Sequence, residues 1–328
     1  MKKIFISGAT GFIGSKLAMR LAEEGNTVHA LYRSEWKKKY IEHENIRLFK
    51  GDITNTESLR NAMNGCEEVY HVAAFAKVWT PDPSDIYHLN IEGAMNVIKE
   101  AQSGGVKKIV VTSTAAVFGP SGRGYVDENS RPEDYFIHYE HSKAILESVI
   151  QTIAKCGIHI VTVNPSRVYG PGILSESNGV TRIIERFIRG KWRMIPGNGK
   201  SEGNYVFIDD VVEGHILAMA KGRSGESYIL GGENADFNTF FRKLSRVSKK
   251  EYSLFNVPLF LMLAASHLML LQAKNTGWSP IIIPGLVKKY NENFRLRTEK
   301  AEKKLGYSPI DLEEGMKKTI EWLKKQKK

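Results

Sequence analysis

The chain has 328 residues, enough for one large α/β unit or two lobes, and its composition is that of an ordinary globular protein. Its net charge of +11 lies largely at residues 37–39, 243–250 and 317–328, which we interpret as solvated surface because no interleaved aromatic residues indicate a nucleic-acid partner. The two cysteines, Cys66 and Cys156, argue against a disulfide framework and for a reducing, cytoplasmic compartment.

The first predicted elements form a strand, a glycine-rich turn and a helix. Residues 4–6 are an apolar run, Gly8, Gly11 and Gly14 follow at spacings of three, and residues 15–24 carry Leu and Ala at helical spacing. Gly8 allows the turn, Gly11 lets the backbone approach a pyrophosphate, and Gly14 lets the helix pack closely. A glycine triplet alone is a weak signal, but this context predicts a dinucleotide site at the helix N-terminus.

The second predicted strand, residues 28–32, bears on the choice of cofactor. An acidic residue that holds the ribose 2′-hydroxyl ends this strand in many NAD sites, whereas Tyr32 and Arg33 stand here. The Arg33 guanidinium can grip a 2′-phosphate, and residues 37–39 add three lysines, so the sequence favours NADP over NAD. If Arg33 faces solvent, or if Glu35 reaches the ribose, NAD remains possible.

Further apolar runs predict strands at residues 46–49, 68–74, 107–112 and 158–163. Because strands and helices alternate over the first half, we expect an α/β fold with a doubly wound parallel sheet of the Rossmann type. Residues 206–221 read as a strand followed by a helix that Asp209 or Asp210 caps. We expect a dinucleotide-binding domain at residues 1–165 and a smaller, irregular substrate-binding lobe at residues 166–328.

Small and polar residues near the strand ends are candidate binding residues. Asp52 can read an adenine amino group or cap the next helix, near residue 54. Ala73 and Ala74 leave room for a ribose beside the backbone. Asn90 lies inside the helical pattern of residues 84–103, where it either faces water or holds a kink near the site.

The fifth strand and the next helix carry the candidate catalytic residues. The strand delivers Ser113 and Thr114 at its carboxyl end, the edge where open parallel sheets bind ligands. The segment 135–154 is predicted to be helical. Within it, Tyr139 and Lys143 are four residues apart and share a face.

These side chains can carry out proton transfer. Tyrosine has a reference pKa near ~10, which a nearby cation lowers, and we expect Lys143 to lower the pKa of Tyr139. With a hydroxyl of Thr114 or Ser113 on the substrate oxygen, Tyr139 can protonate a carbonyl as a nicotinamide supplies hydride. His141 is expected to face away, at the surface. The histidine spacings predict no metal site.

These residues resemble the extended short-chain dehydrogenase/reductase family. The matching motifs, in the family's order, are GATGFIG at 8–14, GDI at 51–53, HVAA at 71–74, NIEGAMNV at 90–97, TSTAAVFG at 112–119, YEHSK at 139–143, NPSRVYGPG at 164–172 and YVFIDDVVEGH at 205–215. They extend to about residue 235 and together are far more specific than any one motif. The resemblance also implies that residues 206–221 return to the nucleotide-binding domain.

The resemblance implies a catalytic set of Thr114, Tyr139 and Lys143, with Asn90 in support. The local motifs and the resemblance together give the expected cofactor contacts: Gly8, Thr10, Gly11, Phe12, Ile13, Gly14, Arg33, Asp52, Ile53, Val72, Ala73, Ala74, Tyr139, Lys143, Pro165, Ser166 and Val168.

Within the family the chain looks most like the dihydroflavonol-reductase-like branch. That branch also holds 3β-hydroxysteroid dehydrogenase relatives, 2-alkyl-3-oxoalkanoate reductases and bacterial hopanoid-associated sugar epimerases. Sugar dehydratases of the family carry an Asp–Glu pair after the active-site Thr, whereas Ala115 and Ala116 stand here. Dehydration therefore lacks its acid and base, while epimerisation does not need them.

The most apolar window is residues 254–271. Asn256, Pro258, Ser266 and His267 interrupt it, so we expect no transmembrane segment. A buried helix of the second lobe is the favoured interpretation, and a hydrophobic lid or a peripheral membrane contact is the alternative. The apolar run at the start of the chain is cut short by polar and glycine residues and is not expected to be a signal peptide.

The sequence leaves three functional hypotheses. The first is an NADP-dependent oxidoreductase acting on a carbonyl or alcohol of a medium-sized, lipophilic small molecule. The second is a nucleotide-sugar epimerase with a retained dinucleotide, and the third is a dinucleotide-sensing protein without turnover. The resemblance also suggests a homodimer that pairs through helices such as the one bearing Tyr139.

Overall fold

The computed structural model describes residues 1–174 and 178–326. Within them, seven strands form a parallel central sheet in the order β10-β6-β5-β4-β1-β2-β3. These strands are β1 (Lys3–Ser7), β2 (Thr27–Tyr32), β3 (Ile46–Lys50), β4 (Glu68–His71), β5 (Lys108–Thr112), β6 (Ile160–Pro165) and β10 (Ser227–Leu230). The predicted α/β fold with a doubly wound parallel sheet is confirmed.

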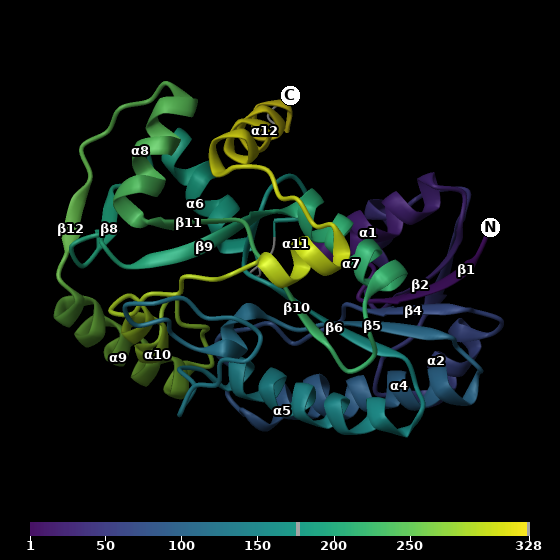
Figure 1. The fold of residues 1–328 in the computed structure, drawn as a ribbon. Helices are drawn as coiled ribbons and strands as arrows, with labels where there is room; N and C mark the ends of the chain where they lie inside the picture. Colours follow the sequence, from purple (N-terminus) through teal and green to yellow (C-terminus); the bar gives the residue numbers. More distant parts are fainter. Residues whose placement is uncertain (175–177, 327–328) are drawn as a thin grey trace.

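Helices cover both faces of this sheet (Figure 1). One face carries α1 (Phe12–Glu23), α7 (Ile208–Lys221) and α11 (Glu299–Leu305); the other carries α2 (Thr56–Met63), α4 (Gly93–Ser103) and α5 (His138–Ile153). Successive residues of β1 point to opposite faces, so Ile4 and Ile6 join one core while Phe5 joins the other. Because both faces are buried, the strand is a continuous apolar run instead of an alternating one.

The direction of the crossovers changes at β1. From β1 the chain passes to β2 and β3 on one side, and then to β4, β5, β6 and β10 on the other. Such a reversal leaves a crevice outside the carboxyl ends of the strands, between the neighbours β1 and β4. The fold therefore creates the place for a ligand before any side chain is considered.

A smaller lobe lies beside this sheet (Figure 1). It contains a three-stranded sheet in the order β11-β9-β7, the pair β12-β8 and several helices. Its elements are β7 (Arg167–Tyr169), α6 (Gly179–Ile188), β8 (Met194–Pro196), β9 (Glu202–Phe207), β11 (Glu233–Asp236), α8 (Phe237–Ser248), β12 (Phe255–Val257), α9 (Leu259–Thr276), α10 (Pro284–Lys289) and α12 (Leu312–Lys325). Aromatic and aliphatic side chains such as Phe187, Phe240 and Met316 form its own core.

The six strands expected from apolar runs are all present, the fourth ending at His71 and not at residue 74. The seventh, β10, was missed, because the prediction assigned this segment to the smaller lobe. In the structure, the chain leaves β9, runs back along the sheet as α7, and pairs β10 with β6 at the sheet edge. The division at residue 165 stays a prediction.

Two helices begin later than predicted. The helix expected from residue 135 begins at His138. The helix expected near residue 54 begins at Thr56, where the Asn55 side chain accepts a hydrogen bond from Ser58 N at 2.9 Å. Asp52 does not cap it and instead accepts from Thr54 N at 3.0 Å.

The predicted cap of α7 is also corrected. The N-cap is Phe207, and neither Asp209 nor Asp210 caps the helix, since both lie in its first turn. Asp210 Oδ2 accepts from Ile310 N at 3.1 Å, and Asp209 pairs with Lys16 at 3.3 Å. Carboxylates in the first turn still interact favourably with the helix dipole.

The prediction of a buried helix in the most apolar window is wrong. In α9 only Ser266 and Ala273 are buried, and Phe260 is 71% exposed. Within the described residues, α9 packs against α10 on one side, and its other side is not covered by a further layer of the protein. The apolar composition of α9 could not reveal this. No helix in the described chain combines the length and the hydropathy that a membrane span requires.

Candidate active site

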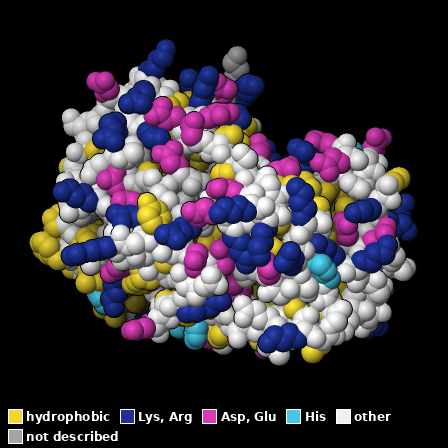
Figure 2. All heavy atoms as spheres, viewed as in Figure 1, with side chains coloured by type: hydrophobic (Ala, Val, Ile, Leu, Met, Phe, Trp, Pro, Cys, Tyr) yellow, Lys and Arg dark blue, Asp and Glu magenta, His cyan; other side chains and the backbone are white. Residues whose placement is uncertain are grey.

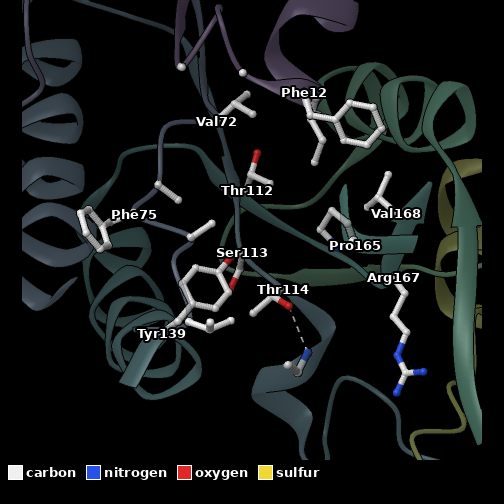
Figure 3. Close-up of a pocket in the computed structure, with 18 of the residues that line it drawn as sticks. Phe12, Val72, Phe75, Thr112, Ser113, Thr114, Tyr139, Pro165, Arg167 and Val168 are labelled. Carbon is white, nitrogen blue, oxygen red and sulfur yellow. Dashed lines mark hydrogen bonds between the residues drawn. The ribbon is translucent and has the colours of Figure 1, made fainter. Parts of the chain in front are cut away.

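A cavity of about 690 Å³ lies at the carboxyl ends of the central strands. Its lining comes from the turn after β1, from the ends of β2, β4, β5 and β6, and from α6, β9, α8 and α10 of the smaller lobe. Figure 3 shows part of this lining, with Phe12 and Val168 on one side and Tyr139 on the other. The cavity is the crevice that the reversal of strand order creates.

The glycine turn makes a close cradle at one end of the cavity. Gly8 has a φ of +71°, and a Cβ added there would lie 2.6 Å from Ala73 N. A Cβ at Gly14 would lie 2.2 Å from Gly8 O, and one at Gly11 would lie 3.1 Å from the same oxygen. A side chain at Gly8 or Gly14 would therefore displace backbone, as the sequence analysis expected.

The N-terminus of α1 points its free backbone N–H groups into this cradle. Gly11 is the N-cap and provides no capping side chain, and the first turn carries no acidic residue. Thr10, Phe12 and Ile13, which the sequence offers as cofactor contacts, line the same end of the cavity. The donors and the positive end of the helix dipole suit a pyrophosphate.

Beyond the cradle, basic and polar side chains surround the end of β2. Arg33 lines the cavity with its side chain 72% exposed, and its Nη1 lies 3.3 Å from Asp52 Oδ2. Asp52 and Ile53, predicted as cofactor contacts, line the cavity together with Lys37. Ser34 also lines it and was missed, although its place directly after Arg33 in the sequence was a usable signal.

Glu35, which the sequence left as a competitor for the ribose, is engaged by lysines. It pairs with Lys38 at 2.7 Å and with Lys50 at 3.4 Å. These contacts lower the pKa of the Glu35 carboxyl, with the hydrogen bond from Lys38 as the largest cause.

Two loops form the middle of the cavity. The segment after β4 contributes its predicted small residues, Val72, Ala73 and Ala74, and the segment from the end of β6 into β7 contributes Pro165, Ser166 and Val168. Ser166 N donates to Leu230 O at 3.2 Å. The missed strand β10 thus holds one wall of the site.

The candidate catalytic hydroxyls meet in the same cavity. Ser113 and Thr114 follow β5, Tyr139 lies in the first turn of α5, and Figure 3 shows the three side chains grouped together. The Thr114 hydroxyl accepts from Ala116 N at 3.3 Å at the start of a 3-10 helix, Ala115–Phe118.

His141 is exposed, as predicted for a residue that faces away from the site. Its ring stacks on that of Tyr135 at a centroid distance of 5.4 Å. It therefore belongs to the outer surface of α5.

Lys143 lies one helical turn beyond Tyr139 and is buried. Its Nζ has no hydrogen-bond partner among the residues that the structure describes. Burial lowers the pKa of this ammonium to about 8, against the opposing effect of Glu147. A buried cation without partners is costly, so this position fits a ligand that brings hydroxyl groups, such as a nicotinamide ribose.

The expected activation of Tyr139 by its neighbour is not found. Burial raises the pKa of the Tyr139 phenol well above its ordinary value, and the Glu140 carboxylate raises it further. Desolvation therefore outweighs any effect of Lys143, and the phenol is held in its protonated form. A protonated phenol is the form that can donate a proton to a carbonyl.

A buried network behind these residues was missed by the sequence analysis. Glu147 Oε1 accepts from Asn164 Nδ2 at 2.6 Å, and Asn164 Nδ2 also lies 3.2 Å from Thr114 O. Glu147 lies one turn after Lys143 on the same face of α5. The helical spacing could have placed it there, but its partner on β6 could not be found from local sequence.

Asn90 lies behind the cavity wall in a π-helical turn, η2 (His88–Glu92), between α3 (Ser84–Tyr87) and α4. It is buried, which excludes the water-facing alternative. Its Oδ1 accepts from Phe75 N at 2.7 Å, and its Nδ2 donates to Ser142 Oγ at 2.9 Å. Since Ser142 Oγ donates to Tyr139 O at 2.8 Å, Asn90 connects the loop after β4 to the helix of the candidate acid.

The outer half of the cavity belongs to the smaller lobe and was not predicted. Its side chains are mostly aromatic or aliphatic: Val180, Ile183, Tyr205, Phe237, Phe240, Phe241, Leu286, Tyr290, Phe294 and Leu296. Arg167 also lines the cavity, with its guanidinium 5.5 Å from the centre of the Tyr205 ring and 5.9 Å from that of Phe237. The helical spacing of Phe237, Phe240 and Phe241 in α8 was a sequence signal that could have located this wall.

The chain was compared with known proteins. Residues 4–231 match the model of the NAD dependent epimerase/dehydratase family. That range includes each site residue predicted from the sequence, while part of the aromatic wall lies beyond it.

Two curated relatives share about the same sequence identity with this chain. "Putative dihydroflavonol 4-reductase" of Synechocystis sp. is 31% identical over 97% of this chain and 93% of its own length. "Sterol demethylase protein B" of Methylococcus capsulatus is 30% identical over 74% of each chain.

The fold is also shared with solved structures. The UDP-glucose 4-epimerase of Thermotoga maritima, solved with UDP-glucose, superposes with a TM-score of 0.82 at 26% identity, over 99% of this chain and all of that one.

Proposed function

Because this chain belongs to the NAD dependent epimerase/dehydratase family, whose members bind NAD(P), we propose that it is an NADP-dependent reductase of a lipophilic ketone. As an oxidoreductase of this family, it acts on CH–OH or carbonyl groups. The observation that carries the proposal is the pair formed by the protonated Tyr139 phenol and the unpartnered, buried Lys143 ammonium. The two residues are one turn apart on α5, and Tyr139 lies beside Thr114, which follows the carboxyl end of β5.

Each residue of this set has a distinct part in the proposed reaction. The Thr114 hydroxyl donates a hydrogen bond to the carbonyl oxygen of the substrate, with Ser113 as the neighbouring alternative. Tyr139 donates its proton to that oxygen as the carbonyl carbon is reduced. Lys143 donates to ribose hydroxyls and places a positive charge near the phenolate that forms. A bound nicotinamide supplies the hydride.

Two features support NADP over NAD. Arg33 and Lys37 line the cavity at the end of β2, where a 2′-phosphate attached to the adenosine ribose would stand. Glu35, the acidic side chain that could receive a ribose hydroxyl, is paired with Lys38 and Lys50. The cationic cluster therefore favours the cofactor with the additional phosphate.

The outer wall supports a lipophilic substrate. Aromatic residues of α8 and of the chain after α10 dominate this half, and Arg167 supplies a cation that can receive a polar or anionic group of the same molecule. The names of the two relatives, a dihydroflavonol reductase and a sterol demethylase protein, also refer to ring-containing substrates.

Epimerisation of a nucleotide sugar is the second candidate, favoured by the structural similarity to a UDP-glucose 4-epimerase. The same Tyr139 could serve it, and no further acid or base is needed. Ala115 and Ala116 line the cavity where sugar dehydratases carry their Asp–Glu pair, so dehydration is not proposed.

The two candidates differ in how the cofactor behaves. We would purify the protein, identify any nucleotide released on denaturation, and follow NADPH consumption with a panel of aromatic and alicyclic ketones. The reductase predicts consumption of NADPH in step with ketone reduction. Interconversion of UDP-glucose by a retained dinucleotide, without net consumption of NADPH, would contradict it.

A further inference from the structure

The helix α9 combines an apolar composition with exposure. Residues 259–271 carry no Asp, Glu, Lys or Arg, yet Phe260, Leu268 and Leu271 are 71%, 69% and 59% exposed. A helix that is apolar on all sides is normally buried. Single exposed apolar residues need no explanation, whereas a contiguous patch indicates an interaction site.

The patch continues beyond the helix. Phe255 of β12 is exposed and stands opposite exposed Met194 of β8 in the strand register. After α9, Trp278 and Ile281 are exposed as well. Figure 2 shows hydrophobic side chains gathered at the edge of the molecule where Figure 1 places α9 and β12. We name as the α9 surface the residues Phe255, Phe260, Leu261, Leu268, Leu271 and Ile281.

The charged residues of the segment that carries this surface, residues 252–291, have one sign. No Asp or Glu occurs between Glu251 and Glu292, whereas Lys274 and Lys288 are present and exposed. The chain as a whole carries a formal charge of +11. The α9 surface is thus apolar with a cationic border, which is complementary to anionic headgroups over an acyl layer.

We propose that the α9 surface docks onto a membrane leaflet that contains anionic lipid. The helix lies in the plane of the interface, with its exposed apolar side chains among the upper acyl chains and Lys274 and Lys288 at the phosphates. Trp278 belongs at the headgroup level, where tryptophan is enriched in membrane proteins. This is docking and not spanning, in keeping with the absence of any spanning helix from the described residues.

The charge pattern argues against a second copy of the chain as the occupant. A two-fold interface brings the same patch of both copies together. Here it would bring Lys274 and Lys288 of both copies into one interface, with no carboxylate from residues 252–291 to compensate. An anionic lipid surface supplies the missing charge.

The proposed docking would bring the cavity close to the bilayer. Helix α10 packs on α9 and contributes Leu286 and Lys289 to the cavity lining. Lys289 forms an ion pair with Glu140, the residue next to Tyr139. One helix therefore separates the docked surface from the site, but the docking itself does not depend on the reaction carried out there.

Vesicle flotation tests the proposal with the full chain. The probes are vesicles of phosphatidylcholine alone and of phosphatidylcholine mixed with phosphatidylglycerol. We expect the wild type to float with the mixed vesicles. The double variant Phe260→Ser and Leu268→Ser should weaken partitioning by at least about tenfold, since it removes two apolar side chains that docking would bury among the acyl chains. Leu48→Ser, an exposed leucine on β3, is the matched control and should float like the wild type.

The charge arm of the test uses Lys274→Glu, which should weaken binding to the mixed vesicles by about fivefold or more. Failure of the wild type to float with mixed vesicles would overturn the proposal. Equal flotation of the double variant would overturn it too. So would a wild-type dimer in sedimentation that the double variant converts to a monomer, because the surface would then be covered by a second copy.

Discussion

Arg33 and Lys143 are two candidate cofactor-binding cations with opposite exposure: Arg33 lines the cavity, and Lys143 is buried in α5 one turn beyond Tyr139. Arg33 has a 72% exposed side chain, and its ion pair with Asp52 is exposed and contributes little to stability. Lys143 is buried, and burial lowers the pKa of its ammonium to about 8. Removal of Arg33 should therefore affect ligand binding alone, whereas Lys143 cannot be changed without disturbing the packing of α5.

Arg33→Ala tests the proposed cofactor choice. Loss of charge-assisted hydrogen bonds to the 2′-phosphate should weaken NADPH binding by about tenfold to a hundredfold. NADH, which lacks that phosphate, should bind as it does to the wild type. The measurement is titration calorimetry with both cofactors, and Arg47→Ala, an exposed arginine of β3, is the control. Equal weakening of NADH and NADPH binding would show that Arg33 does not read the phosphate.

For individual site residues, the sequence could predict those that lie within one local motif. The glycine turn, Thr114 and the pair Tyr139 and Lys143 depend on spacing along a single turn or helix, and all of them lie at or directly behind the cavity. The bond between Glu147 and Asn164 could not be predicted, because it joins a helix to a different strand. The raised pKa of Tyr139 also depends on burial that no local pattern reveals.

Among the elements, the π-helical turn η2 is an irregular segment that carries a residue of the candidate site. An inserted turn of this kind is rare and frequently lies at functional sites. Here it carries Asn90, which satisfies Phe75 N and Ser142 Oγ at the same time. The Asn90 side chain thereby links the loop after β4 to α5, and both of these segments contribute residues to the cavity lining.

Asn90→Ala should lower the free energy of unfolding by about 1–3 kcal/mol, because the part-buried Phe75 N–H loses its acceptor. Urea unfolding followed by circular dichroism measures this change. Asn61→Ala, the same substitution at an exposed position of α2, should leave stability unchanged or slightly raised, since alanine favours helix. An Asn90→Ala variant as stable as wild type would mean that water replaces the amide and that the connection is dispensable.

The sequence was least informative where an element's position depends on its neighbours. The strand β10 has four residues and follows a helix that the sequence did predict, but only pairing with β6 assigns it to the central sheet. The composition of α9 favours burial over exposure, yet in the structure much of the helix is exposed. What decides between them is whether another part of the chain covers the helix, and that is a property of the whole fold.

Over the whole molecule, the cavity joins residues from Gly8 to Leu296. The central sheet supplies the cradle and the hydroxyls, and the smaller lobe supplies the aromatic wall. Each half has its own core, so the chemistry and the substrate preference can vary separately. The first half was predictable because its motifs are local; the second was not, because its aromatic residues converge from β9, α8 and the chain after α10.

The most direct test of the account is Tyr139→Phe, measured in both binding and turnover. The variant should retain most of its affinity for NADPH, while kcat with a ketone reduced by the wild type falls by about a hundredfold to ten-thousandfold, since the proton donor is lost. Tyr135→Phe, whose hydroxyl lies 3.4 Å from Val117 O, is the control and should keep its turnover. Undiminished turnover by Tyr139→Phe, with NADPH still bound, would contradict the assignment of this phenol as the acid.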